Sequence, residues 1–178
     1  GAFTGEISSI MLKTSGAEFV LIGHSERRHV FNESDKTINK KMLRAIADDV
    51  KTILCVGEKE DEKQNEKTEE VIRRQLRSGL ENIALEDVLK IIIAYEPVWA
   101  IGTGKTATPD IAENVHKFIR KELKEIYSQK VANSISILYG GSVKENNIKD
   151  LMNEDDIDGV LVGGASLDAS TFANIVNY

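Results

Sequence analysis

Short apolar runs alternate with longer amphipathic segments along the 178-residue chain. Five runs rich in β-branched and aliphatic residues are predicted strands: Phe19 to Ile22, Thr52 to Val56, Ile91 to Tyr95, Ile135 to Tyr139 and Gly159 to Val162. Each run is apolar on both faces. This indicates strands of a parallel sheet that helices cover, rather than half-solvated hairpins.

The segments between these runs have the 3.6-residue periodicity of helices. Asp35 to Asp49 carries one apolar stripe, formed by Ile38, Met42, Leu43 and Ile46. A second helix is predicted from Pro109 onward, where Thr108 can cap the first turn. Its apolar face comprises Ile111, Val115, Phe118, Ile119, Leu123 and Ile126. One helix is also expected before the first strand, so the fold class is α/β.

The repeated strand and helix units fit two architectures. Strands start roughly 25 to 45 residues apart, as in an open doubly wound sheet or in a (β/α)8 barrel, and periodicity alone does not separate them. A barrel of eight units needs ~250 residues, so residues 1–178 would hold five to six units in a single domain.

Composition narrows the function classes. The net charge of −6 argues against binding along nucleic acid or anionic lipid, both of which need a concentrated basic surface. The single Cys55 cannot form an internal disulfide, so a reducing, cytoplasmic compartment is expected. No apolar stretch is long enough for a membrane span, and no signal-peptide pattern opens the chain.

One stretch of mixed charge, Glu58 to Glu70, resembles an interaction motif at first sight. Apolar residues follow at Val71, Ile72 and Leu76. This pattern predicts a solvated loop that leads into the first turns of a surface helix.

A histidine follows the first predicted strand. His24 precedes a short helical turn whose N–H groups could point at its imidazole, which would keep it neutral and able to donate to a substrate oxygen. Taken alone, His24 is more simply a structural histidine. His29, in a loop, and His116, on a helix, are also interpreted as structural.

The third strand is followed by the most informative stretch, AYEPVWAIGTGK. Glu96 stands at the strand end, and a carboxylate that burial has desolvated can act as a general base near neutral pH. The loop after it runs from a rigid Pro97 to a Gly-Thr-Gly end, with Val98, Trp99 and Ile101 at its tip. Such a segment resembles a lid that excludes water from a reactive intermediate.

The last two strands end in small-residue turns, YGGSV and LVGGASL, each expected to open a helix. Glycine lets backbone N–H groups approach an anion, and a helix N-terminus favours negative charge, so the pair predicts a phosphate site. Cys55, inside an apolar run, is interpreted as a small core residue rather than a nucleophile.

Taken in order, these motifs closely resemble those of triosephosphate isomerase. The matching segments are GAFTGE, IGHSERR, CVGE, AYEPVWAIGTGK, YGGSV and LVGGASL. The resemblance implies a (β/α)8 barrel of which this chain holds about the last five β/α units, strands 4 to 8 of the family fold. It also implies that Glu96 is the base that moves a proton between two substrate carbons, and that His24 is the electrophile.

The same resemblance assigns further residues. Glu26 and Cys55 would support the site, Cys55 by packing, and no metal or organic cofactor is implied. The substrate phosphate would be held by Gly102, Ser142, Gly163 and Gly164. The lid would consist of Pro97, Val98, Trp99, Ala100, Ile101, Gly102, Thr103, Gly104 and Lys105. A homodimer would form through the Gly1 to Glu6 loop, with Thr4 reaching beside the partner's site.

The chain departs from the family at its beginning. The family's first strand carries an asparagine and a lysine that contact the substrate, and no segment here corresponds to its first three strands. A charge placed at a developing oxyanion contributes about 3 to 4 kcal/mol, so this chain alone is expected to be weakly active or inactive. Two alternatives stay open: a non-catalytic product that acts through open barrel edges, and another barrel enzyme for phosphorylated sugars.

Overall fold

The computed structural model describes residues 2–101 and 106–178 and contains one parallel sheet. Its strands follow in the order β1-β2-β3-β4-β5. They span Phe19–Ile22, Lys51–Val56, Ile91–Tyr95, Ile137–Tyr139 and Gly159–Val160. All four pairings that join neighbours run parallel, so the strands predicted from the apolar runs and their parallel direction are confirmed.

Two strands are shorter than predicted. β4 begins at Ile137 rather than Ile135, because the Ile135 N–H donates to Val131 O at the end of the preceding helix. β5 ends at Val160 rather than Val162, and the Leu161 N–H makes a last bond of 2.9 Å to Tyr139 O. The apolar run in each case extends beyond the residues that pair as a ladder.

Helices fill the segments between the strands. The α-helices are α1 (Ser9–Thr14), α2 (Ser25–His29), α3 (Asp35–Ala47), α4 (Glu60–Gln64), α5 (Thr68–Gly79), α6 (Leu85–Val88), α7 (Pro109–Ile126), α8 (Gln129–Ala132), α9 (Ile148–Met152) and α10 (Ala169–Val176). The described residues also form two short 3-10 helices, η1 (Val98–Ala100) and η2 (Gly164–Leu167). Helix α7 begins at the predicted residue, and Thr108 Oγ1 caps it by accepting from the Ile111 N–H. His29 was expected in a loop but is the last residue of α2.

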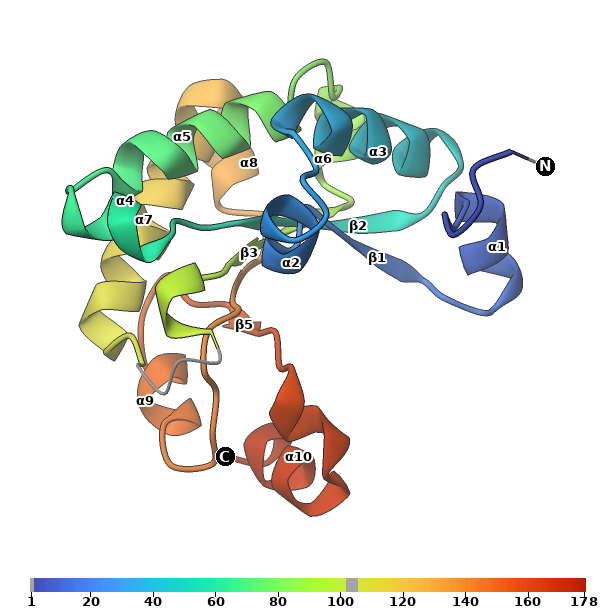
Figure 1. Ribbon diagram of the computed structural model, residues 1–178. Coiled ribbons are helices and arrows are strands. Elements are labelled where there is room, and N and C mark those ends of the chain that lie inside the picture. The colour runs from blue at the N-terminus through green and yellow to red at the C-terminus, as the bar shows by residue number, and fades with distance from the viewer. Residues whose placement is uncertain (1, 102–105) are drawn as a thin grey trace.

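The sequential strand order decides between the two architectures. A doubly wound sheet reverses its order at a switch point, whereas right-handed crossovers between strands taken in sequence place all the helices on one face. Figure 1 shows α3, α5 and α7 along the outside of a curved sheet, with α1 and α10 at the two ends of an arc. The chain therefore forms part of a barrel wall, and the doubly wound alternative is excluded.

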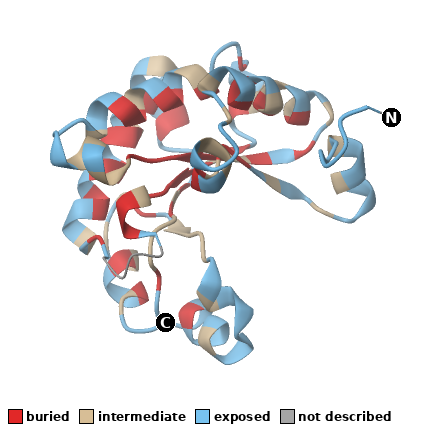
Figure 2. Cartoon of the chain, in the orientation of Figure 1, coloured by how far each residue is buried: buried red, intermediate tan, exposed pale blue. Residues whose placement is uncertain are grey.

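The core lies between the sheet and this outer layer of helices. Figure 2 shows buried residues along β2 and β3 and on the inner sides of α3, α5 and α7. The prediction of strands buried on both faces is wrong for β1, where Phe19 is 42% and Leu21 45% exposed. Among residues 2–101 and 106–178, strands β1 and β5 each pair with one neighbour only, so both are open edges, as the incomplete barrel predicted.

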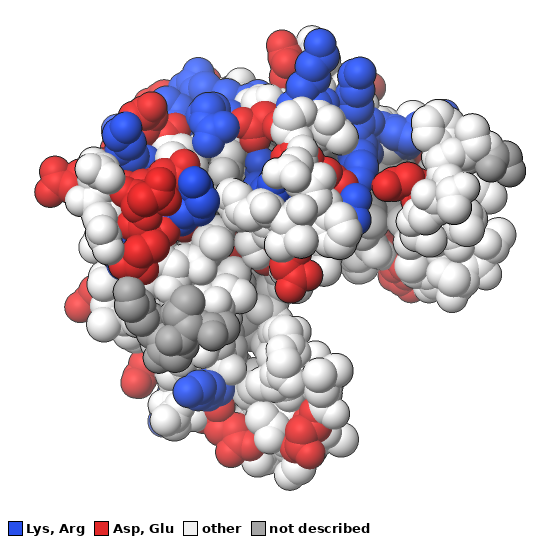
Figure 3. Space-filling view, in the orientation of Figure 1, with Lys and Arg blue, Asp and Glu red and all other residues white. Residues whose placement is uncertain are grey.

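The surface carries both signs of charge. In Figure 3, Lys and Arg gather with Asp and Glu over the helices at the top of the view, while the surfaces facing the open side of the arc are mostly uncharged. Within residues 2–101 and 106–178, no helix is long and apolar enough to cross a membrane.

His116 is completely buried on α7. Its ring lies edge-on to Tyr95 at 5.9 Å between centroids, and its Nδ1 lies 3.1 Å from Asp156 O. Burial lowers the pKa of His116 from 6.5 to about 4. The fold thus favours the neutral imidazole, in agreement with the structural role predicted for this histidine.

Acid is therefore expected to weaken the fold through His116. Above pH 6.5 the imidazole is neutral in both states, whereas between pH 6.5 and 4 only the unfolded chain binds the proton. From pH 7.5 to 4.5 the free energy of unfolding should fall by about 2.5 kcal/mol more for the wild type than for His116→Gln. Urea unfolding at several pH values measures this difference, and parallel curves for the two proteins would contradict it.

Candidate active site

The strand register brings the carboxyl ends of β2, β3 and β4 together. Val56 pairs with Tyr95, and Tyr95 pairs with Tyr139. One residue further along, the Glu96 N–H donates to Val56 O at 2.8 Å and the Gly140 N–H to Tyr95 O at 2.7 Å. The residues that follow the strands therefore form one continuous rim, where sites of parallel β/α proteins lie.

His24 and Glu96 meet at this rim. His24 follows β1 and caps α2, while Glu96 follows β3. His24 Nε2 lies 3.0 Å from Glu96 Oε1, and the two side chains are 32% and 3% exposed. The structure thus places the predicted electrophile in direct contact with the predicted base. The two are far apart in the sequence: Ser25, which follows His24, is 71 positions from Glu96.

The start of α2 fixes both partners. The Glu26 N–H donates to His24 Nδ1 at 3.3 Å, so a neutral imidazole carries its proton on Nε2, which faces Glu96. The Ser25 N–H donates to Glu96 Oε2 at 2.9 Å. The carboxylate is therefore held by two donors from consecutive residues.

The pKa of His24 is raised, whereas the helix N-terminus considered in the sequence argument would lower it. A helix N-terminus disfavours imidazolium, but the hydrogen bond to Glu96 and its negative charge raise the pKa of His24, and burial lowers it only in part. The sequence argument considered the helix alone. The carboxylate that opposes it comes from another strand.

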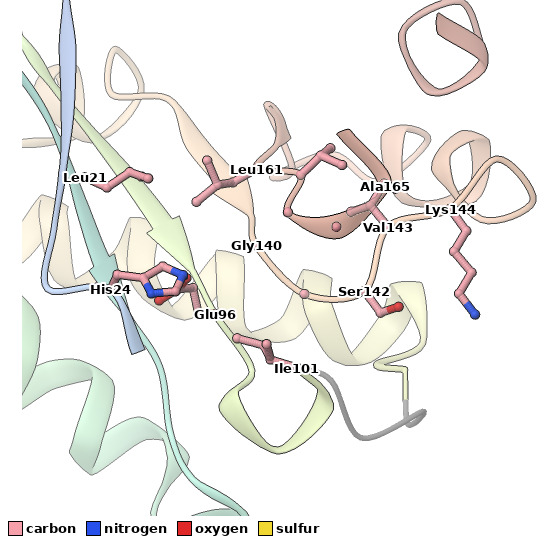
Figure 4. A pocket seen from close by; sticks show the side chains of 14 residues that line it. Leu21, His24, Glu96, Ile101, Gly140, Ser142, Val143, Lys144, Leu161 and Ala165 are labelled. Carbon is pink, nitrogen blue, oxygen red and sulfur yellow. The ribbon is translucent and has the colours of Figure 1, made fainter. Parts of the chain in front are cut away.

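A pocket of about 380 Å³ opens in front of this pair. Figure 4 shows His24 and Glu96 on one side of it and Ser142, Ala165 and Lys144 toward the other, with Leu161 between. Ser142, Gly163 and Gly164 all line it, as the predicted phosphate site requires. Among the described lining residues, Lys144 is the one Lys or Arg.

The glycine turns differ in part from prediction. The YGGSV turn after β4, residues 139 to 143, was expected to open a helix, but α9 begins only at Ile148. The turn after β5 opens η2 at Gly164, a 3-10 helix rather than an α-helix. The backbone N–H groups offered to an anion at Ser142 therefore belong to a loop, without the field of a helix N-terminus.

The expected lid begins as a packed segment. Trp99 and Ala100 lie in η1 with 7% and 1% exposure, so Trp99 is anchored rather than at a tip, whereas Ile101 is exposed and lines the pocket. Pro97 precedes this turn, and Val98, its first residue, donates its N–H to Glu58 O at 3.1 Å. Gly102, Thr103, Gly104 and Lys105 lie outside the described residues.

The prediction that the charged stretch from 58 to 70 is solvated is wrong for Glu58. Most of that stretch forms α4 and the start of α5 near the surface, but Glu58 is 1% exposed. Its Oε1 accepts from Trp99 Nε1 at 2.8 Å and from Tyr95 Oη at 3.1 Å, and burial raises the pKa of its carboxyl. A periodicity argument groups Glu58 with its charged neighbours, although it lies two residues after the end of β2 and is buried there.

Glu58→Gln and Glu58→Leu are expected to differ sharply. Gln retains an acceptor for the Trp99 indole and the Tyr95 hydroxyl and removes a charge whose burial is unfavourable, so its effect on stability should stay within about 1 kcal/mol. Leu removes the acceptor from both buried donors and should cost about 3 kcal/mol. Urea unfolding at pH 8 compares the variants, and equal losses would contradict this account.

The remaining predicted residues have weaker support. Cys55 is fully buried, and desolvation raises the pKa of its thiol well above the ordinary value, which agrees with a packing role. Glu26 is exposed, and its side chain does not line the pocket. Within the described part of the chain, no group of His, Cys, Asp and Glu could hold a metal ion.

Sequence reasoning missed several residues at the rim. The Ser25 N–H binds the base, and the first turn after His24 could have indicated it. Gly140 lies against Glu96, since a Cβ there would be 3.0 Å from Glu96 Cγ. Gly57 is more tightly placed, because its Cβ would be 1.7 Å from Glu96 O. No local pattern predicts either contact.

Comparison with known proteins agrees with this arrangement. The family model for triosephosphate isomerase matches residues 1–178. Triosephosphate isomerase of Finegoldia magna is 52% identical over 179 residues, which cover 100% of this chain and 71% of the relative. The enzymes of Geobacter metallireducens and Caldanaerobacter subterraneus subsp. tengcongensis are each 54% identical over 178 residues, covering all of this chain and 71% and 72% of the relatives.

Fold and site together define an enzyme of the parallel β/α barrel class, with a carboxylate and an imidazole in contact at the strand ends. The comparisons specify the class further as an isomerase. The chain belongs to the triosephosphate isomerase family.

Proposed function

We propose that this site interconverts dihydroxyacetone phosphate and D-glyceraldehyde 3-phosphate, a step of glycolysis and gluconeogenesis. The observation that carries the proposal is the contact between His24 Nε2 and Glu96 Oε1 at the wall of a pocket of about 380 Å³. A base and a hydrogen-bond donor placed side by side suit proton transfer between a carbon next to a carbonyl and its neighbour.

Glu96 is proposed as the base. Its carboxylate removes a proton from C1 of the ketose, the electron pair forms a C1–C2 double bond, and the carbonyl oxygen becomes an enediolate oxygen. The proton of the C1 hydroxyl then passes to the oxygen on C2, and return of the first proton from Glu96 to C2 gives the aldose with its C1 carbonyl, so no atom is gained or lost. The carboxylate must first leave the Ser25 N–H and His24, to which it is bonded without substrate.

His24 is proposed as the electrophile. With its Nδ1 occupied by the Glu26 N–H, its Nε2–H can donate to the oxygen on which charge develops. When substrate separates the imidazole from Glu96, the interaction that raises the pKa of His24 is removed, and the helix N-terminus then favours the neutral imidazole. Substrate binding therefore prepares the neutral donor.

The phosphate would lie at the opposite wall. Gly163, Gly164 and Ser142 line that part of the pocket with small side chains, which lets backbone N–H groups approach an anion. The expected contribution of Gly102 and of a lid up to Lys105 belongs to the same proposal. The lid would exclude water from the enediolate, which decomposes in solvent.

The family likeness also supports assembly as a homodimer through residues 1–6. The described residues of this loop are all exposed, and Phe3 is 83% exposed. Thr4 would reach toward the partner's pocket. In the single chain, no partner covers this apolar side chain, so burial of Phe3 would favour association.

A coupled assay of glyceraldehyde 3-phosphate turnover tests the proposed reaction. The 178-residue chain alone has two open sheet edges and is expected to be slow. Joined to the segment of the Geobacter metallireducens relative that it does not match, it should gain at least about a hundredfold in rate. A folded fusion without turnover would overturn the proposed function. Ordinary turnover by the chain alone would overturn only the expectation that it is slow.

A further inference from the structure

Arg28 is a buried cation beside the site that the proposed reaction does not use. It lies in α2, four residues after His24, and its side chain is 7% exposed. The guanidinium turns back toward the start of its own helix. Its Nε donates to Gly23 O at 2.7 Å, and its Nη2 donates to Cys55 O at 2.9 Å.

These two carbonyls stand at the carboxyl ends of neighbouring strands. Gly23 follows β1 and directly precedes His24, whereas Cys55 lies one residue before the end of β2. One planar group therefore connects the backbone that carries the imidazole to the strand beside it. The fork of guanidinium donors suits this task, because two N–H groups point in fixed directions.

Gly23 has the backbone conformation and the missing side chain that this contact requires. Its φ of +77° lies in the left-handed region, and a Cβ there would be 2.9 Å from Arg28 Nη2 and 3.1 Å from Cys55 O. Glycine thus allows the chain to turn sharply from β1 into α2 while the guanidinium approaches the turn closely. The orientation of the next peptides follows from this turn.

The charge of Arg28 is balanced away from the pocket. Its Nη1 donates to Asp35 Oδ1 at 2.7 Å, at the first turn of α3, and Asp35 Oδ2 accepts from Arg74 Nη1 at 2.6 Å. Asp35 is 19% exposed. The carboxylate, shared with Arg74, offsets part of the charge of the Arg28 guanidinium on the side away from the two carbonyls.

We infer that Arg28 is a positioning residue: by holding the carbonyls of Gly23 and Cys55, it aims the His24 imidazole and the Ser25 N–H at Glu96. The inference rests on the proposed function of that pair but concerns its geometry. Loss of the fork should let the Gly23 to Ser25 backbone turn, which separates both donors from the carboxylate. A displacement of about 1 Å of a reacting group can lower the rate by about a hundredfold.

Nuclear magnetic resonance of Arg28→Met tests the geometry directly. In the wild type, the Ser25 amide proton should be shifted downfield by the carboxylate, and the His24 ring should titrate above its ordinary pKa. In the variant, the amide should lose its downfield shift and the pKa of His24 should return toward its ordinary value. Arg74→Met removes the other cation on Asp35 and should leave both signals unchanged.

A merely structural role predicts another result. Arg28→Met would then unfold at a lower temperature while both signals stay as in the wild type, and this outcome would overturn the inference. If Arg28→Met does not fold, Arg28→Lys replaces it, because lysine keeps the charge opposite Asp35 without the fork. Its two signals should move in the same directions by smaller amounts, and unchanged signals would again overturn the inference.

These signals do not depend on turnover. In the fusion described above, Arg28→Met should lower kcat about a hundredfold and leave KM within a factor of two. Absence of turnover in every fusion, with the signals displaced, would reject the proposed function and retain the role of Arg28. Normal turnover with unchanged signals would reject the role of Arg28 alone.

Discussion

Replacing Glu96 by Gln should lower kcat of the fusion by about a thousandfold, because a positioned general base contributes about 10²- to 10⁴-fold to proton transfer. Gln has nearly the same shape, and its one carbonyl oxygen can still accept from one of the two donors, the Ser25 N–H or the His24 Nε2–H. The pocket should therefore keep its overall form and lose the proton acceptor together with one hydrogen bond at the rim. Steady-state kinetics in the coupled assay measure the change, and KM should move little.

Glu70→Gln is the matched control for this substitution. Glu70 is exposed on α5, away from the residues that line the pocket, and its replacement removes the same charge. Activity equal to that of the wild type is expected for it. If Glu96→Gln retains more than about a tenth of kcat, another group accepts the proton and the assigned role of Glu96 is incorrect.

Sequence patterns were sufficient to predict the boundaries of those strands and helices whose ends are determined by their own residues. β1 and β3 begin and end where the sequence predicts, and α7 begins there, since an apolar run or a capping residue with Pro109 defines each of these boundaries. β4 is different. The apolar Ile135 satisfies a strand pattern, but its N–H bonds to Val131 O at the end of α8, and this local bond to the preceding helix lies outside the run itself.

The residues of the candidate site also fall into those that the sequence could predict and those that it could not. His24 and Glu96 could be predicted, because residues after parallel strands gather at one rim and the flanking motifs resemble those of a known family. The buried Glu58 and the fork of Arg28 could not, because their partners lie on other elements. The raised pKa of His24 belongs to the same group, since its largest cause is a carboxylate on another strand.

Gly57 illustrates how such a contact constrains both the fold and the site. It follows β2, its N–H donates to Gln75 Oε1 at 2.8 Å, and the Gln75 amide donates back to Gly57 O at 3.1 Å. The backbone of Glu96 lies directly over it, and a Cβ at Gly57 would be 1.7 Å from Glu96 O and 2.7 Å from Glu96 C. Both obstructing atoms belong to the backbone, so no rotation of a side chain can relieve the overlap.

Gly57→Ala is accordingly expected to destabilise the chain by about 3 kcal/mol or more, at the upper end of the cost of overpacking. To make room, the ends of β2 and β3 must separate, which weakens the bond from the Glu96 N–H to Val56 O. The base would move with its backbone, so activity should fall together with stability. Urea unfolding measures the first effect and the coupled assay of the fusion the second.

Gly164→Ala provides the comparison for stability, because a Cβ at Gly164 meets no atom within 4 Å. Its free energy of unfolding should stay within about 0.5 kcal/mol of the wild type. If Gly57→Ala behaved in the same way, the ends of β2 and β3 could separate at little cost. The rim that holds Glu96 against His24 would then be compliant, and the contact between base and electrophile would need another source of rigidity than the packing of these two strands.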